Sequence, residues 1–224
     1  MKRHFKFESR FAVLTCLSVL VFVTAALAGP PLICHPFDIG KEKSLPWAGT
    51  SWNLSGNEGY DTSHLAQDTL ALLDTKAPVI VRMETLRRAT LYTSKDAKAG
   101  KELLTRLHAR AGAADNTKSP DALALFDFGY LVETYNQGLR KDQNPAAGVD
   151  GYDFVKRALA IRSADPEMEF AAALITLGRA QAEHEEHVRK AMAGAKSDPL
   201  LSHNLAKSFL GNEKQTVAEA LARK

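Results

Sequence analysis

The stretch Asp165–Pro199, DPEMEFAAALITLGRAQAEHEEHVRKAMAGAKSDP, carries the signals that decide the fold. It begins and ends with an Asp-Pro pair, and the prolines Pro166 and Pro199 lie 33 residues apart. An aspartate before a proline is typical of a helix start, because the carboxylate caps the first turn and proline has no amide hydrogen to leave unpaired. The segment between the pairs is too long for one ordinary helix, so we expect a break near residues 180–183 and a hairpin of two helices.

Helical signals also fill the chain between residue 62 and this stretch. Alanine and leucine recur at spacings of three and four residues, which is the helical period. We expect Thr62 or Ser63 to cap a helix that runs through Leu73 and Pro78 to open a second. In Ser119-Pro120-Asp121 we expect a capping side chain before Pro120 as the first helical residue. A further helix is expected over Asp150–Arg162.

Strand signals are nearly absent. The one β-branched cluster, Val79-Ile80-Val81, runs into Arg82 without a turn, so we interpret it as helix. Gly100 is a candidate interruption of the helix that follows. The sequence therefore predicts an all-α protein, with successive antiparallel helix hairpins over residues 62–224.

Residues 1–28 have the pattern of a secretory signal peptide. The first ten residues carry four basic side chains and one acid, Glu8, and no charge follows between Phe11 and Ala28. The run ends in Ala26-Leu27-Ala28, which offers small residues at the positions that a signal peptidase reads. We expect cleavage before Gly29 and an exported protein, periplasmic or extracellular. A retained membrane anchor is the alternative, because the apolar run is at the lower limit for crossing a bilayer.

Removal of this peptide makes the remaining chain formally neutral. The whole chain has 29 Lys and Arg against 26 Asp and Glu, and residues 1–28 hold four of the former and one of the latter, which leaves 25 of each. A neutral chain has no basic footprint for nucleic acid or anionic lipid. We therefore expect neither nucleic-acid binding nor stable membrane insertion after cleavage.

Cys34 is the single cysteine after residue 28, so no intramolecular disulfide can form. It is a candidate reactive thiol, and the alternative is a small apolar side chain packed beside Leu32 and Ile33. The adjacent pair Cys34 and His35 is not interpreted as catalytic, because catalytic pairs are usually distant in sequence and brought together by the fold.

Residues 29–61 differ in composition from the rest. Prolines and glycines punctuate the segment too densely for a helix. It nevertheless holds four large aromatic side chains, which seldom stay in water together: Phe37, Trp47, Trp52 and Tyr60. We expect an ordered but irregular N-terminal arm that packs on the helical body.

The segment His184–Pro199 resembles the second helix of a tetratricopeptide repeat, including the terminal Asp-Pro that begins the next unit. His187 stands where that family has a small alanine, and Gly194 takes another alanine position. The resemblance implies a superhelical stack of helix pairs whose concave face binds peptides or proteins, without catalysis or a cofactor. The arm segments 34–38 and 44–47 resemble the mature start of exported bacterial proteins without an assigned function, which implies a bacterial, exported context.

Four charged residues on one predicted helix, Arg82, Glu84, Arg87 and Arg88, form the most concentrated charged group. Glu84 can reach Arg87 and Arg88 at spacings of three and four, so a surface ion-pair row is one interpretation. The other is a groove that binds the carboxylate of a peptide terminus, which the forked donors of arginine suit.

Three aromatic residues complete the candidate binding set: Trp47, Trp52 and Tyr152. Tyr152 lies in the segment Asn144–Asp153, which is a candidate binding loop and equally a connector between helices. The histidines His184 and His187 are three residues apart, whereas the zinc motif His-Glu-x-x-His places them four apart. We therefore predict no metal site there and interpret residues 184–187 as a solvated, charged helix start.

Two functional hypotheses follow. The first is an exported helical-repeat protein that acts as a protein-binding, peptide-binding or scaffold module, with no catalytic residue and no cofactor. The alternative is a small-ligand carrier or an enzyme with a site between the arm and the helices. That alternative requires Arg82 or His35 to converge with Tyr130 or Tyr152 in a deep pocket.

Overall fold

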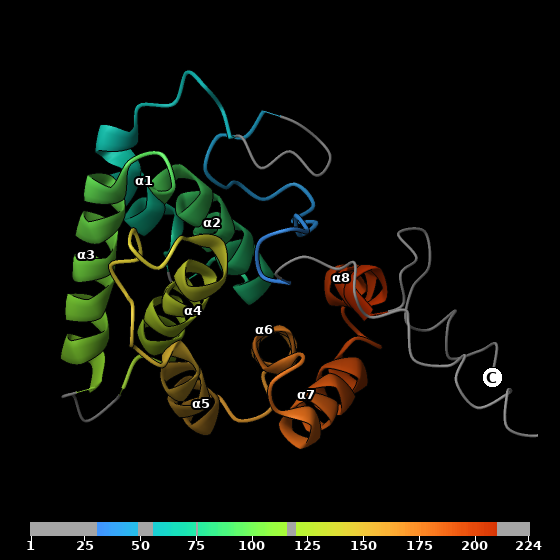
Figure 1. The fold of residues 1–224 in the computed structure, drawn as a ribbon. Coiled ribbons are helices and arrows are strands. Elements are labelled where there is room, and N and C mark those ends of the chain that lie inside the picture. Colours follow the sequence, from blue (N-terminus) through green and yellow to red (C-terminus); the bar gives the residue numbers. More distant parts are fainter. Residues whose placement is uncertain (1–30, 49–55, 75, 116–119, 210–224) are drawn as a thin grey trace, which may run out of the picture.

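The computed structural model describes residues 31–48, 56–74, 76–115 and 120–209. Within these ranges the chain forms helices and no strand, so the prediction of an all-α protein is confirmed (Figure 1). The elements in chain order are the 3-10 turn η1 (Thr62–His64), α1 (Leu65–Leu72), α2 (Val79–Thr93), α3 (Ala97–Asp115), α4 (Ala122–Gly138), α5 (Gly151–Ile161), α6 (Pro166–Thr176), α7 (Gln181–Gly194) and α8 (Pro199–Phe209).

Most helix starts lie where the sequence predicts them. Pro166 and Pro199 are the first residues of α6 and α8, and α7 begins at Gln181, next to the expected break. The helix α5 spans almost the whole of the expected segment 150–162. Aspartate carboxylates accept hydrogen bonds from backbone amides in the first turns of α4, α5, α6 and α8; these residues are Asp121, Asp150, Asp165 and Asp198.

Three details of the prediction are wrong. Asp121 caps α4, so Pro120 precedes the cap instead of opening the helix as expected. Asp61 caps the first helical turn in place of Thr62 or Ser63. Gly100 does not interrupt α3; a Cβ at this position would lie 2.0 Å from Cγ2 of Thr93, so glycine permits the close approach of α2.

The helix α2 is capped by a residue from another helix. Its N-cap, Pro78, makes no side-chain hydrogen bond to the first turn, and the amide of Ile80 instead donates to Glu167 Oε2 of α6 at 3.0 Å. Burial raises the pKa of Glu167 to about 7, with a smaller contribution from the carboxylates of Asp198 and Asp165. The start of α2 therefore depends on a carboxylate 87 residues further along the chain.

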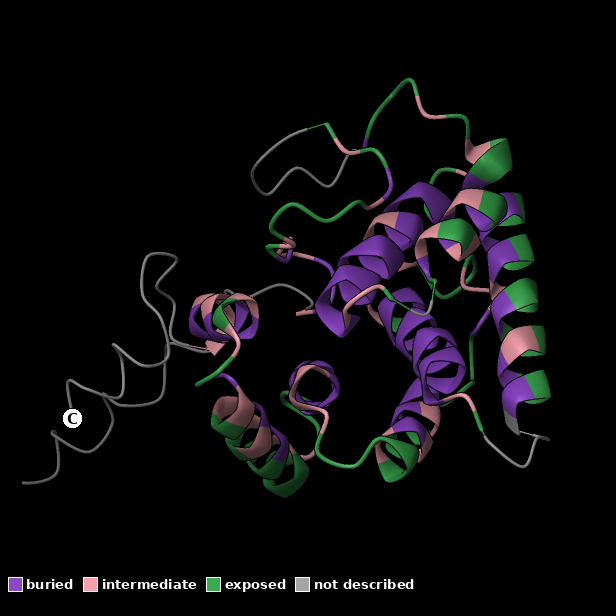
Figure 2. Ribbon diagram, turned by 180° about the vertical axis from the view of Figure 1, so that it is seen from behind, coloured by how far each residue is buried: buried purple, intermediate pink, exposed green. Residues whose placement is uncertain are grey.

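The helices α2, α4 and α6 form the centre of the molecule. Nearly every described residue of α2 and α4 is buried, while α3 and α7 expose their outer faces (Figure 2). Extensive contacts join α4 to α5 and α6 to α7, and α8 packs against both α6 and α7. The α4–α5 contact is close: a Cβ on Gly151 would lie 2.3 Å from the carbonyl oxygen of Gly129.

The described part of the arm is irregular and lies against α2 and α8. Its apolar side chains Leu32, Phe37 and Leu45 are buried in the same core as the helices. Asn204 of α8 holds the arm through two hydrogen bonds to the backbone of Asp38, at 2.9 Å from the Asp38 amide and 2.9 Å to the Asp38 carbonyl. The arm is therefore an integral layer of the fold over these residues.

The helices that the structure describes include none whose length and apolar character would let it cross a membrane.

Candidate functional site

A hollow surface of the described residues lies between α5 and α7 and borders α6. Two hollows, of about 600 Å³ and about 520 Å³, adjoin there and share Tyr152, Lys156 and Glu183 as lining residues. Thr176 and Glu169 of α6 contribute to the floor of the first and second hollow, respectively. We call the two hollows together the α5–α7 cleft. Volumes of this size are ordinary for sites that bind small molecules or peptide side chains.

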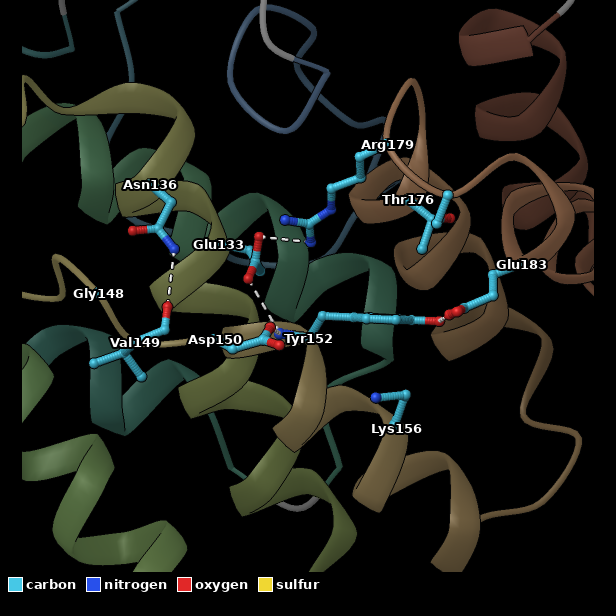
Figure 3. Close-up of a pocket in the computed structure, with 11 residues that line it drawn as sticks. Glu133, Asn136, Gly148, Val149, Asp150, Tyr152, Lys156, Thr176, Arg179 and Glu183 are labelled. Carbon is cyan, nitrogen blue, oxygen red and sulfur yellow. Dashed lines mark hydrogen bonds and ion pairs between the residues drawn. The ribbon is translucent and has the colours of Figure 1, made fainter.

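Glu133, a buried residue of α4, organises one end of the cleft. Its Oε1 accepts hydrogen bonds from the backbone amides of Gly151 and Tyr152 at 2.9 and 3.1 Å, and Asp150 caps the same helix. Its Oε2 accepts from Nη2 of Arg179 at 2.9 Å (Figure 3). A carboxylate at the positive end of α5 is favourable, and it fixes Arg179 at the edge of the first hollow.

Tyr152 extends from α5 across the cleft to α7, as Figure 3 shows. Its hydroxyl lies 2.6 Å from Glu183 Oε2 and 2.7 Å from His187 Nε2. Burial, reinforced by the hydrogen bond to the Glu183 carboxylate, raises the pKa of Tyr152 above its ordinary value. The phenol is therefore neutral and has a hydrogen to donate. We call Tyr152 with Glu183 and His187 the Tyr152 bridge.

The bridge continues into α6 through His187. Nδ1 of His187 pairs with Oε2 of Glu169, a residue with only 3% of its surface exposed. Nζ of Lys190 lies 3.3 Å from the other oxygen of Glu169. Lys156 and Arg179 approach the ring of Tyr152, at 5.1 and 5.9 Å from its centroid. Charged and polar groups from α5, α6 and α7 are thus connected through Tyr152 and His187.

Arg82, one of the sequence candidates, lies outside the cleft in the interior of the molecule. Its Nη1 is 2.7 Å from Oδ2 of Asp127, and both side chains are fully buried. Further guanidinium donors meet backbone carbonyl oxygens, which belong to Leu73, Asp74 and Ala77. Burial raises the pKa of Asp127 to about 6 despite the nearby guanidinium groups.

The other three charged candidates form what we call the arm cluster, Glu84, Arg87 and Arg88. Glu84 pairs with Arg87 at 2.9 Å and with Arg88 at 2.7 Å, the spacing partners expected from the sequence. Glu84 and Arg87 are buried rather than on the surface, and Arg88 is partly exposed, because the arm covers the group: the amide of Phe37 donates to Glu84 at 3.0 Å.

The arginines of the arm cluster bind the arm backbone. Arg87 Nη1 donates to the carbonyl of Ile33 at 3.1 Å, and Arg88 Nη1 donates to the carbonyl of Leu45 at 2.6 Å. Trp47 covers both guanidinium groups, at 5.2 and 5.9 Å from its ring centroid. The donors that could bind a peptide carboxylate are thus directed at the protein's own backbone.

The remaining candidates are divided between regions. Tyr152 is in the cleft, Trp47 is on the arm cluster, and Trp52 lies outside the described residues. Cys34 is a free, partly exposed thiol on the arm. The convergence expected for a small-ligand site is not found in the cleft, because its lining includes Tyr152 and neither Arg82 nor His35.

Sequence reasoning missed most of the cleft. The prediction that His187 belongs to a solvated helix start is wrong, because only 9% of its surface is exposed. Its mismatch with the tetratricopeptide pattern was the available signal, because an imidazole in place of a small alanine needs a polar partner. Glu133 in the middle of an apolar helix is a comparable signal, since a buried carboxylate needs donors.

The cleft offers hydrogen bonding, charge and apolar surface, and the described residues contain no cluster of three or more potential metal ligands. Comparison with known proteins adds no assignment: no family model, no curated protein and no solved structure matches this chain.

Proposed function

We propose that the protein is an exported module of tetratricopeptide-like helix pairs that binds a segment of another protein in the α5–α7 cleft. The observation that carries the proposal is the pair of adjoining hollows on either side of Tyr152. An extended segment that crosses Tyr152 would place successive side chains in the two hollows. Export is supported by the signal pattern of residues 1–28, and the helix-pair architecture by the resemblance of residues 184–199.

Charge complementarity favours a partner segment with an acidic side chain. The acids around the first hollow already accept hydrogen bonds: Glu133 from two amides and Arg179, Asp150 from an amide, and Glu183 from Tyr152. Lys156 has a long ion pair with Asp153, at 3.7 Å between two exposed side chains. An incoming carboxylate would therefore gain more from Lys156, whose ion pair is long, than a cation would gain from the occupied acids.

The test is selection of linear peptides from a random display library on residues 29–224, followed by calorimetric measurement of Kd. Ala182→Trp places a large side chain in the second hollow, and Lys156→Glu reverses the charge of a residue that lines both hollows. Each substitution is expected to weaken peptide binding by about tenfold or more. Arg106→Glu, on the exposed face of α3, is the matched control and should leave Kd unchanged. Peptides that bind Ala182→Trp as tightly as the parent protein would refute the cleft as the site.

A second candidate function is carriage of a small anion between the arm and α8. A pocket of about 320 Å³ lies there, and its lining includes the basic residues Arg88, His203 and Lys207 with one acid, Asp38. A compact carboxylate or phosphate suits this excess of positive charge. Calorimetry with citrate and with inorganic phosphate, on the parent and on Lys207→Gln, tests it; absence of heat from either anion would eliminate this function.

A further inference from the structure

The hydrogen atoms of the Tyr152 bridge can be counted from its contacts. A tyrosine hydroxyl has one hydrogen to donate, and the ionised carboxylates of Glu183 and Glu169 only accept. If Tyr152 donates to Glu183, the contact between Tyr152 and His187 needs a hydrogen on Nε2 of His187. The contact with Glu169 then needs a second hydrogen, on Nδ1. With both carboxylates ionised, all three contacts are satisfied when His187 is an imidazolium.

Any other arrangement that satisfies the three contacts has the same number of hydrogens. With a neutral imidazole, either Glu169 or Glu183 must be protonated and donate. The connected set of Tyr152, His187, Glu169 and Glu183 therefore binds one proton more than a neutral histidine and two carboxylates would hold. This proton belongs to the set as a whole rather than to one residue.

The charged groups around the bridge come from every element packed on α7. The helix α5 contributes Lys156, α6 contributes Glu169, α7 itself contributes Glu183, Glu186 and Lys190, and the α6–α7 turn contributes Arg179. The helix α8 meets this part of α7 through an aromatic contact of Phe209 with His184. Glu183 contacts Tyr152 and Glu169 contacts His187, and Lys190 lies 3.3 Å from Glu169 on the other side.

We propose that this proton controls the α5–α7 cleft: with the proton bound, Tyr152 and Glu169 hold α7 against α5 and α6, and release of the proton loosens α7. Without it, every placement of the remaining hydrogens leaves one of the three contacts with two lone pairs face to face. Each contact involves α7, so α7 loses one of three bonds in every case. The regulatory meaning rests on the proposed function of the cleft, whereas the proton linkage itself needs no ligand.

Distance measurement across the second hollow tests the linkage directly. Ala160 of α5 and Ala182 of α7 line this hollow and are exposed, so both accept nitroxide labels as cysteines in a Cys34→Ser background. We expect the pulsed-EPR distance distribution to shift to longer values between about pH 5 and about pH 8. Hydrogen exchange of the α7 amides, corrected for intrinsic rates, should quicken by about tenfold over the same interval, as expected for loss of one hydrogen bond.

His187→Gln should remove the pH-dependent shift, because the amide does not titrate. Tyr152→Phe, which keeps the ring, should remove it as well and guards against a folding failure of the first variant. His203→Gln is the matched control, since it removes a histidine of α8 that lies 3.7 Å from Asp38 and away from the cleft; it should keep the shift. A parent protein with the same distances at both pH values, or a shift that persists in His187→Gln, would overturn the linkage. Loss of peptide binding with an intact shift would overturn only the proposed function.

Discussion

Two groups of polar residues join separate segments of this molecule, and they differ in what their partners are. The arm cluster joins Glu84 to two arginines and to the backbone of the arm, and the side chains of Glu84 and Arg87 are fully buried. The Tyr152 bridge joins a hydroxyl, an imidazole and carboxylates beside open hollows. The charged side chains of the arm cluster bind the arm backbone and keep the arm attached. The groups of the Tyr152 bridge lie beside solvent and share hydrogens, so they can respond to pH. The arm cluster, which is the more conspicuous charged group in the sequence, therefore attaches the arm. The Tyr152 bridge, which is less conspicuous in the sequence, lies in the candidate site.

The largest expected effect comes from Glu84. Its replacement in Glu84→Gln leaves two arginines without a carboxylate, one of them 1% exposed, and leaves a single oxygen to accept from both arginines and the Phe37 amide. We expect a loss of about 3–5 kcal/mol in the free energy of unfolding, measured by urea denaturation. Glu102→Gln removes an exposed ion pair with Arg106 and should change stability by less than about 1 kcal/mol. Equal effects of the two substitutions would show that burial does not distinguish the arm cluster.

A steric change at the base of the cleft should come next. In Gly151→Ala the new Cβ would meet the carbonyl oxygen of Gly129 at 2.3 Å, so α5 must move away from α4. We expect a loss of about 1–3 kcal/mol in stability, and weaker peptide binding because Tyr152 moves with α5. Gly148→Ala, in the preceding loop, provides a glycine control with open space around its Cβ position, although its φ of 85° adds local strain. Unchanged stability of Gly151→Ala would contradict the close α4–α5 contact.

The carboxylate that caps α2 gives a pH signature separate from that of the cleft. The pKa of Glu167 is raised from 4.5 to about 7, so folding takes up a proton between these values. Stability from this group is present below about pH 4.5 and is lost as the pH rises to about 7, by about 1–2 kcal/mol because partial exposure screens the charge. Glu167→Gln keeps an acceptor for the Ile80 amide and should flatten this slope in denaturation series. If the free energy of unfolding depends on pH equally in the parent protein and in Glu167→Gln, the pH dependence comes from another group, for example Asp127.

The smallest effect is expected for the bridge itself. Tyr152→Phe removes two hydrogen bonds, but Glu183 is exposed and water can replace the hydroxyl beside it. We expect a loss of about 1 kcal/mol in the free energy of unfolding, well below that of Glu84→Gln. Lys156→Ala, which shortens a neighbouring exposed side chain, is the control. A loss as large as that of Glu84→Gln would mean that the bridge is an attachment of the same kind as the arm cluster.

Local signals predicted most of the helices. Asp165-Pro166 and Asp198-Pro199 act within three residues of themselves, through a carboxylate and the next amides, so neighbouring residues suffice to recognise them. The run Val79-Ile80-Val81 was correctly interpreted as helix, because it continues without a turn into the polar residues that follow. Gly100 misled because its role is set by Thr93 on another helix, which no local rule contains.

The site was less predictable because its contacts are distant in sequence. Tyr152 meets His187 across 35 residues, and Arg179 meets Glu133 across 46, so neither pair has a characteristic spacing. The sequence predicts that Glu84 pairs with Arg87 and Arg88, which follow it at spacings of three and four residues. Whether these three residues face water depends on the arm, which is separated from them by about 40 residues or more. Pairing along a helix is readable from sequence, and burial by another segment is not.

The two hydrogen bonds between Asn204 and the backbone of Asp38 join the beginning of the described chain to its last described helix, across 166 residues. During synthesis the arm emerges long before α8 exists, so it cannot complete its native contacts until most of the chain has been made. Contacts of such high sequence separation slow folding, because the long intervening segment must be ordered first. A chain that stops before Pro199 is therefore expected to leave residues 38–40 open to protease, and the order of arrival means that this part of the arm is fixed only after α8 has been made.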